Sequence, residues 1–321
     1  EKPLSGNGRG NGEMDMFWSL AGEVGKLFLM MLIGFVVYRL GIITVEESKI
    51  LSKMMLYIVL PAVVLHSFMV EFTPDKTRGL LLSYAAALGV SLVLVAAVTL
   101  LKRPLHLTPV ESMSVIYFNT GIAVPIVGAA IGQEWVVYAT AMICVHTFLV
   151  WTHCKFTLSG ERTVSWKKLF LNPNMISMLI GIALFTLQLP VPAVVSGTVE
   201  GMADLFGPLS MVVTGILIGS LSWERVRSYR RLPLVVGLRM VACPLAALLL
   251  VKALHLAQMA PDGSLILTAA LLSVATNSGS TITQMVQVYG GDAEYSSVIC
   301  AVTSLLSMAA LPLFGQMVRI L

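Results

Sequence analysis

Apolar runs of about 20 residues follow one another along almost the whole chain, separated by short polar segments. A run of that length is enough for one helix to cross the hydrocarbon core of a bilayer. Hydrophobic residues make up 57% of the sequence and charged residues only 12%, whereas soluble domains carry about 25% charged residues. The sequence therefore predicts an all-α polytopic membrane protein.

We predict ten transmembrane helices, which cover residues 17–40, 49–70, 79–101, 109–131, 134–152, 172–190, 201–221, 232–254, 264–288 and 293–316. Residues 1–13 are rich in Gly and Asn, unlike the rest of the chain, and we interpret them as a remnant of added sequence. The predicted organisation is a first five-helix repeat over 14–152, a cytoplasmic linker over 153–171, and a second five-helix repeat over 172–321.

Local signals support several helix boundaries. Thr108-Pro109-Val110-Glu111 has the pattern of a capping box with Pro at the first helical position, and Asn172-Pro173 opens the sixth span in the same way. Pro61 and Pro208 fall inside the second and seventh spans, where we expect them to kink or unwind the helix.

Basic residues predict the orientation in the membrane, because cytoplasmic loops carry an excess of Lys and Arg. One set of loops holds 13 of them, namely Arg39, Lys49, Lys53, Lys102, Arg103, Lys155, Arg162, Lys167, Lys168, Arg225, Arg227, Arg230 and Arg231. The opposite set holds 5, namely Lys26, Lys76, Arg78, Lys252 and Arg319. We therefore expect a multi-pass protein of the cell (plasma) membrane with both termini extracytoplasmic.

Two apolar spans are interrupted in matching ways, one at Asn119-Thr120-Gly121 and one at Asn277-Ser278-Gly279. A further glycine stands 11 residues after the glycine of each break, at Gly132 and at Gly290. A backbone group freed in lipid costs several kcal/mol, so such a break must be buried in protein or line a wet cavity. Paired interruptions of this kind indicate the binding site of a secondary transporter.

The two halves of the chain also resemble each other. Residues 31–34 and 178–181 both read MLIG, and Pro61 and Pro208 share the same offset of 147 residues. Each half holds five spans, an odd number, so the two halves must lie in the membrane with opposite topology. The sequence thus predicts inverted repeats, an architecture common among secondary transporters.

Several function classes lack their sequence signals. The four cysteines are spread singly, and His146 and His153 have no third ligand at a fitting spacing, so no metal site is predicted. There is no GxxxxGK[ST] or HExxH motif, so we expect neither an ATPase nor an enzyme. The net charge of +4 comes from loop residues and does not indicate a nucleic-acid surface. No cofactor is expected beyond Na⁺ or H⁺ as a coupling ion.

A set of short motifs resembles the auxin efflux carrier family, namely Leu60-Pro61, Asn119-Thr120-Gly121 with Pro125, Asn172-Pro173, Leu238-Arg239 with Pro244, and Tyr289-Gly290-Gly291-Asp292. Members include plant PIN-type auxin exporters and bacterial permeases for malonate, malate and similar acids. The resemblance implies a scaffold and a transport domain, a homodimer, and broken fourth and ninth helices that cross at the substrate site. It extends remotely to sodium-coupled bile-acid-type transporters. Unlike many members, this chain has no Pro at the ninth-helix break.

A broken helix presents N–H groups that suit a carboxylate and C=O groups that suit a cation. The predicted substrate-binding residues are Asn119, Thr120, Gly121, Pro125, Asn277, Ser278 and Gly279. The candidates for ion coupling are Ser280, Thr281, Gln284 and Arg239. Two alternatives remain open: the small polar residues could only join helices, and Arg239 could snorkel to the membrane surface.

These observations predict a secondary carrier for small organic anions such as carboxylates or dicarboxylates, working by alternating access in the bilayer. Two other functions fit the same pattern. One is a sodium-coupled symporter of the same fold, and the other is a membrane sensor that binds the ligand without moving it.

Overall fold

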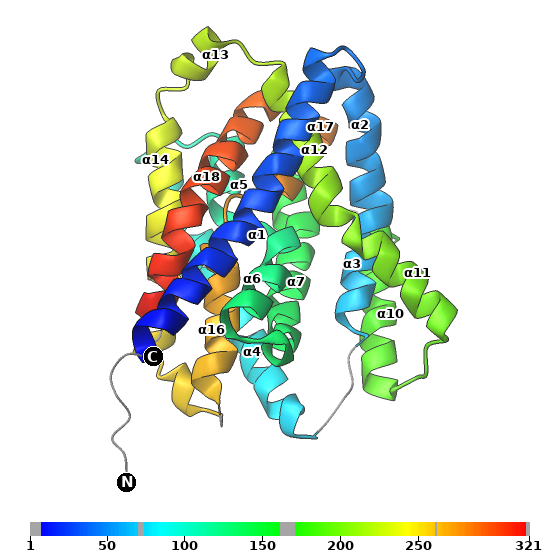
Figure 1. Cartoon of the computed structure of the whole chain (residues 1–321), viewed down its shortest axis with the longest axis vertical. Helices are drawn as coiled ribbons and strands as arrows, with labels where there is room; N and C mark the ends of the chain where they lie inside the picture. Colours follow the sequence, from blue (N-terminus) through cyan, green and yellow to red (C-terminus); the bar gives the residue numbers. More distant parts are fainter. Residues whose placement is uncertain (1–7, 70–73, 161–170, 261, 319–321) are drawn as a thin grey trace.

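The apolar runs fold into a bundle of helices in the computed structural model, which describes residues 8–69, 74–160, 171–260 and 262–318 (Figure 1). Over these residues the first half forms α1 (Gly8–Arg39), α2 (Val45–Met54), η1 (Met55–Val59), α3 (Leu60–Ser67), α4 (Pro74–Lys102), α5 (Pro109–Ile116), α6 (Thr120–Ile131), η2 (Gln133–Trp135), α7 (Val136–Leu149), η3 (Val150–Cys154) and α8 (Lys155–Ser159). The second half forms α10 (Pro173–Leu187), α11 (Ala193–Asp204), α12 (Phe206–Gly219), α13 (Trp223–Ser228), α14 (Leu232–Gly237), η4 (Leu238–Ala242), α15 (Cys243–Ala253), η5 (Leu256–Gln258), α16 (Gly263–Ala275), α17 (Ser280–Tyr289) and α18 (Ala293–Val318).

Five described helices are long and apolar enough to cross a membrane, namely Val45–Ser67, Arg78–Lys102, Val136–Ser159, Ala193–Gly219 and Leu232–Ala253. A sixth candidate is the pair Ala293–Ser307 and Ala309–Val318, which meet at 59°. Pro173–Leu187 and Gly263–Ala275 are shorter apolar helices. The predicted class, a helical multi-pass membrane protein, is confirmed at this level, and the number of ten spans stays a prediction.

The capping box predicted at Thr108 is confirmed. The backbone N–H of Glu111 donates to Thr108 Oγ1 at 3.2 Å, and the Thr108 N–H donates to Glu111 Oε2 at 2.7 Å. Asn172 also caps its helix, since its side chain accepts from the Asn174 N–H at 2.9 Å. Beyond its capping role, the buried Glu111 carboxylate pairs with Arg231 Nε at 3.1 Å.

The two predicted proline irregularities take different forms. Pro61 is the second residue of α3 and directly follows the π-helical turn η1, so the chain absorbs the missing N–H with wider turns instead of ending the helix. Near Pro208 the chain does divide: α11 ends at Asp204 and α12 begins at Phe206. Pro244 repeats the first arrangement, since it follows the π-helical turn η4.

Two predicted boundaries differ from the structure. The span predicted to end at residue 152 continues through η3 and α8 to Ser159, so the first residues of the predicted linker are helical, while 161–170 lie outside the described residues. Polar residues continue a helix there because the ladder of backbone hydrogen bonds does not depend on hydropathy. Similarly, α1 begins at Gly8, inside the segment interpreted as added sequence.

We describe the helices as two groups, which also contact each other. In the first, α1 and α2 pack on α12, and α10 and α11 pack on α3; Figure 1 shows α3, α10 and α11 together at one side of the bundle. In the second, α16 contacts α4, α6, α7 and α15, and α17 contacts α18. Helix α1 crosses between them and also contacts α18 and α6.

Polar side chains join the two groups where α2 meets α17. Ser52 Oγ donates to Gln287 Oε1 at 2.5 Å, and Gln287 Nε2 donates to Ser48 Oγ at 2.8 Å. The hydroxyls of Tyr57 and Tyr289 lie 2.6 Å apart. The two serines are completely buried, so their hydrogen bonds form away from water, whereas that of the tyrosine pair is exposed.

The α1–α12 contact requires glycine, and we expect Gly215→Ala to destabilise the protein. A Cβ at Gly215 would lie 1.9 Å from the Met31 carbonyl oxygen, which belongs to the backbone of α1 and cannot move aside. Forced separation of two packed helices costs about 1–3 kcal/mol, measurable as a lower unfolding temperature in detergent. Gly89→Ala on α4, whose nearest atom would lie 4.0 Å away, is the matched control. Equal unfolding temperatures for the two variants would contradict the expectation.

Candidate functional site

The structure contains a helix break at each of the two interrupted segments, and the breaks lie against each other. Helix α5 ends at Ile116 and α6 begins at Thr120, while α16 ends at Ala275 and α17 begins at Ser280. The residues between them pair as an isolated antiparallel bridge between Phe118 and Ser278. The extended chain thus joins the centres of two broken helices that are far apart in sequence.

Two backbone hydrogen bonds hold this bridge. The Asn119 N–H donates to the Asn277 carbonyl at 3.0 Å, and the Gly279 N–H donates to the Tyr117 carbonyl at 3.0 Å. Backbone groups that the breaks release therefore satisfy each other inside the protein, where a lone N–H or C=O would be costly.

Gly279 allows the two breaks to approach this closely. Its φ of −62° is accessible to any residue, so backbone conformation does not explain the glycine. A Cβ at this position would lie 2.7 Å from the Phe118 carbonyl oxygen. The absent side chain, rather than a proline, lets the break between α16 and α17 form against the other.

Arg239 binds backbone carbonyl groups at the C-terminal ends of α5 and α16, the helices that precede the two breaks. Its Nη1 donates to the Val115 carbonyl of α5 at 3.2 Å, and its Nη2 donates to the Thr276 carbonyl after α16 at 2.8 Å and to the Val274 carbonyl. The side chain is 0% exposed, so the snorkelling interpretation is wrong. A guanidinium here complements the partial negative charge of two helix C-termini at once.

The Arg239 charge has no acidic partner. Within the described part of the chain Arg239 forms no ion pair, and its contacts there are backbone carbonyls and Cys243, whose thiol also donates to the Val115 carbonyl at 3.5 Å. Buried charges are costly unless they are paired or well hydrogen-bonded. The region where the two breaks meet is therefore buried and holds an uncompensated positive charge.

The two break asparagines are both buried, at 2% and 1% exposed. Asn119 Oδ1 accepts from Ser280 Oγ at 3.5 Å, which connects one break to the start of α17. Asn277 Nδ2 donates to Ser304 Oγ at 2.7 Å, while Asn277 Oδ1 has no partner in the described residues. The Asn277 amide is therefore only half used by the fold.

Ser278, predicted to bind substrate, forms hydrogen bonds within the fold. Its hydroxyl donates to the Ser114 carbonyl at 3.0 Å, and its backbone N–H donates to Thr303 Oγ1 at 3.1 Å. Thr120 is buried in the first turn of α6. Gly121 and Pro125 lie in the same helix, but the surroundings of these two residues are outside what the structure describes.

The predicted ion-coupling residues of α17 gather at its start. Ser280, Thr281 and Gln284 are at most 3% exposed, and α17 begins without a side-chain cap at Gly279. Both Gln284 Oε1 and Gln284 Nε2 lack a partner among the described residues. A buried amide with two unsatisfied groups is rare in folded proteins, which makes Gln284 a candidate to contact a ligand.

Sequence reasoning missed the contribution of α18. Thr303 and Ser304 bind the second break, as described above, and Cys300 Sγ lies 3.7 Å from Asn277 Nδ2. Cys300, Thr303, Ser304 and Ser307 recur at spacings of three and four, and they form a polar stripe in the middle of α18. This polar stripe is the sequence signal that could have indicated a contact between α18 and the second break.

His146 and His153 contact residues of the first break. The His146 ring lies 4.4 Å from the Phe118 ring centroid, and His153 Nδ1 lies 2.9 Å from the Tyr117 hydroxyl. No cluster of three potential metal ligands occurs among the residues searched in the described part of the chain. A cavity of about 10 Å³ beside Tyr117, Phe118 and His146 is about the size that holds one water.

A helical chain with several membrane-length helices and two interrupted segments that meet in its interior defines a membrane transport protein. The profile of a family described as "Membrane transport protein" matches residues 20–163 and 158–315. The chain belongs to this family, that of the auxin efflux carriers, which is a family of transporters and not of enzymes. A search of curated proteins found no match.

Proposed function

We propose that the protein is a secondary carrier for small organic anions, which bind where the two helix breaks meet. The observation that carries this proposal is the uncompensated charge of Arg239. Its guanidinium already covers the carbonyl ends of α5 and α16, the positions that would otherwise suit a cation. The ends that remain are the N-termini of α6 and α17, which favour a negative charge.

A carboxylate substrate would complete this arrangement. It would supply the counter-charge that Arg239 lacks and accept hydrogen bonds from the uncapped start of α17. The Gln284 amide, buried and without a partner, would donate to the same group. Asn119 and Asn277 would fix the position of the acid, and Ser278 would hold the break in shape.

Entry of a substrate would require movement, which supports alternating access. The asparagines and Gln284 are buried, and the small cavity beside the first break has room for about one water. We propose an elevator-like or rocking movement of the helix group that contains α16 and α17 against the group that contains α1, α2 and α12. We further propose a homodimer in the cell membrane with both termini extracytoplasmic.

We expect Gln284→Met to remove substrate binding without loss of stability. The substitution keeps the shape of the side chain and removes two unsatisfied polar atoms, so the free protein should unfold at the same or a higher temperature. The measurement is the shift in unfolding temperature of purified protein with malonate, malate, lactate or indole-3-acetate. An acid that stabilises the wild type should not stabilise the variant.

Gln287→Met is the matched control on the same helix. It removes the hydrogen bonds to Ser48 and Ser52 and should lower the unfolding temperature while leaving the acid-induced shift intact. Uptake of the same acid into proteoliposomes then separates a carrier from a sensor, because a sensor binds without flux. An acid-induced shift of wild-type size in Gln284→Met would contradict the assignment of the site.

A sodium-coupled symporter is the second candidate. The unpartnered Asn277 Oδ1 and Gln284 Oε1, with the hydroxyls of Ser280 and Thr281, form an oxygen-rich set at the start of α17. Hard cations prefer such oxygen ligands. Sodium dependence of the acid-induced shift would favour this candidate, and equal shifts in sodium and choline buffers would exclude it in favour of sodium-independent transport.

A further inference from the structure

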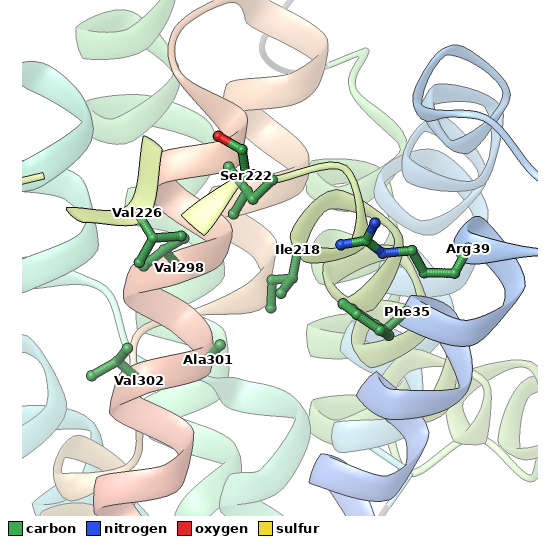
Figure 2. A pocket seen from close by; sticks show the side chains of 9 residues that line it. Phe35, Arg39, Ile218, Ser222, Val226, Val298, Ala301 and Val302 are labelled. Atoms are coloured by element: carbon green, nitrogen blue, oxygen red, sulfur yellow. The ribbon is translucent and has the colours of Figure 1, made fainter. Parts of the chain in front are cut away.

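A separate cavity lies between α1, α12 and α18, at the end of the bundle where α13 is found. Its volume is about 190 Å³, against about 10–15 Å³ for the site of one water. Its walls are almost entirely aliphatic or aromatic, and the helices supply Phe35, Ile218, Val298 and Ala301 among others (Figure 2). Leu221, just after α12, also lines it. Water in such a cavity would find few hydrogen-bond partners.

This cavity is distinct from the crossing of the breaks. On α18 its lining residues are Val298, Ala301 and Val302, whereas Cys300 and Ser304 contact the second break. At about 3.6 residues per turn these two sets lie on opposite sides of the helix. A ligand in the cavity would therefore occupy the outside of α18 and not the proposed substrate site.

One cationic side chain, that of Arg39, lies at the edge of this apolar cavity. Arg39 ends α1, its Cζ lies 5.2 Å from the centroid of the Phe35 ring, and Figure 2 shows its guanidinium directed toward Ile218. Arg39 is exposed and forms no ion pair in the described part of the chain. Ser222, also exposed, adds a hydroxyl on the α12 side.

More positive charge lies close by. Val226, a lining residue, belongs to α13, which also carries the exposed Arg227 and one acid, Glu224. This is the end of the bundle where the basic loops of the sequence gather, the end expected to face the cytoplasm. An apolar groove with unpaired arginine at such an end has the chemistry of a site for an anionic lipid.

We propose that this cavity binds one acyl chain of an anionic phospholipid, whose phosphate group pairs with Arg39. Charge complementarity favours an anionic over a zwitterionic lipid, and the apolar walls favour a lipid over a free phosphate. Because the cavity lies between α12 of one helix group and α18 of the other, the bound lipid would contact both groups.

The test is a lipid titration of delipidated protein in detergent. We expect dioleoyl phosphatidylglycerol to raise the unfolding temperature more than dioleoyl phosphatidylcholine and to appear as a bound adduct in native mass spectrometry. Arg39→Gln should weaken phosphatidylglycerol binding about five- to tenfold, the loss expected for one arginine near a membrane surface, and weaken phosphatidylcholine binding less. Arg103→Gln, at an exposed arginine outside the cavity, is the charge-matched control.

A second variant tests the apolar half of the proposal independently of charge. Ala301→Phe should fill the cavity and weaken both lipids while Arg39 is kept, with Ala301→Val as a milder variant if the first does not fold. Equal effects of the two phospholipids on the wild type, or equal losses in Arg39→Gln and Arg103→Gln, would overturn the proposal. So would binding of glycerol 3-phosphate as strong as that of the lipid, or loss of a dimer instead of lipid in Ala301→Phe.

Discussion

Replacing Arg239 by glutamine is expected to abolish transport and to destabilise the protein by about 1.5–3 kcal/mol, the range for hydrogen bonds that involve a charged group. The guanidinium bonds to carbonyl groups from both broken helices, and a glutamine amide cannot reach them all. Two groups of C-terminal carbonyls would then be buried without a donor. The measurements are the unfolding temperature in detergent and the uptake of a bound acid into proteoliposomes.

Two further variants serve as comparisons for Arg239→Gln. Arg239→Lys keeps the charge but lacks the planar fork that reaches two helices, so it should retain part of the stability and little of the flux. Arg230→Gln removes an exposed arginine from the loop before α14 and should change neither quantity. Wild-type stability and flux in Arg239→Gln would show that the carbonyl ends are satisfied in some other way.

Gly279→Ala is expected to reduce flux at least tenfold, since it separates the two breaks. The added Cβ would lie 2.7 Å from the Phe118 carbonyl oxygen, so the bridge between Phe118 and Ser278 would have to open. Overpacking of this kind costs about 1–3 kcal/mol. Flux in proteoliposomes and the unfolding temperature measure the two effects.

The matched control is Gly237→Ala, in α14. A Cβ there meets no atom within 4 Å, so alanine should be neutral or stabilise the helix by about 0.5–1 kcal/mol. Flux in Gly279→Ala equal to that of Gly237→Ala would mean that close contact between the breaks is not needed for transport.

Local sequence signals predicted the helix breaks, the capping box and the family. Asn-x-Gly inside an apolar run weakens a helix through the properties of its own residues. A capping box likewise depends only on residues three apart. These features depend on neighbours along the chain. The class of the protein could be predicted for the same reason, because a membrane leaves few ways to satisfy a backbone.

Features that depend on distant contacts could not be predicted in this way. Arg239 binds carbonyls 35, 37 and 124 residues away, and periodicity carries no information about such separations. The sequence therefore left the role of Arg239 open between function and snorkelling. For the same reason Ser278 was assigned to the substrate, although its hydroxyl is committed to the Ser114 carbonyl.

The hydrogen bonds that join α2 and η1 to α17 affect how long the proposed carrier stays in one conformation. Ser48 and Ser52 bond to Gln287, and Tyr57 bonds to Tyr289, across the two helix groups that would move apart. Each such bond contributes about 1 kcal/mol, and every 1.4 kcal/mol changes an equilibrium tenfold. Together they would bias the resting population toward the present arrangement without touching the substrate. Substitutions at Ser48 or Gln287 would then alter the time that the carrier spends in this conformation, and its substrate selectivity would stay the same.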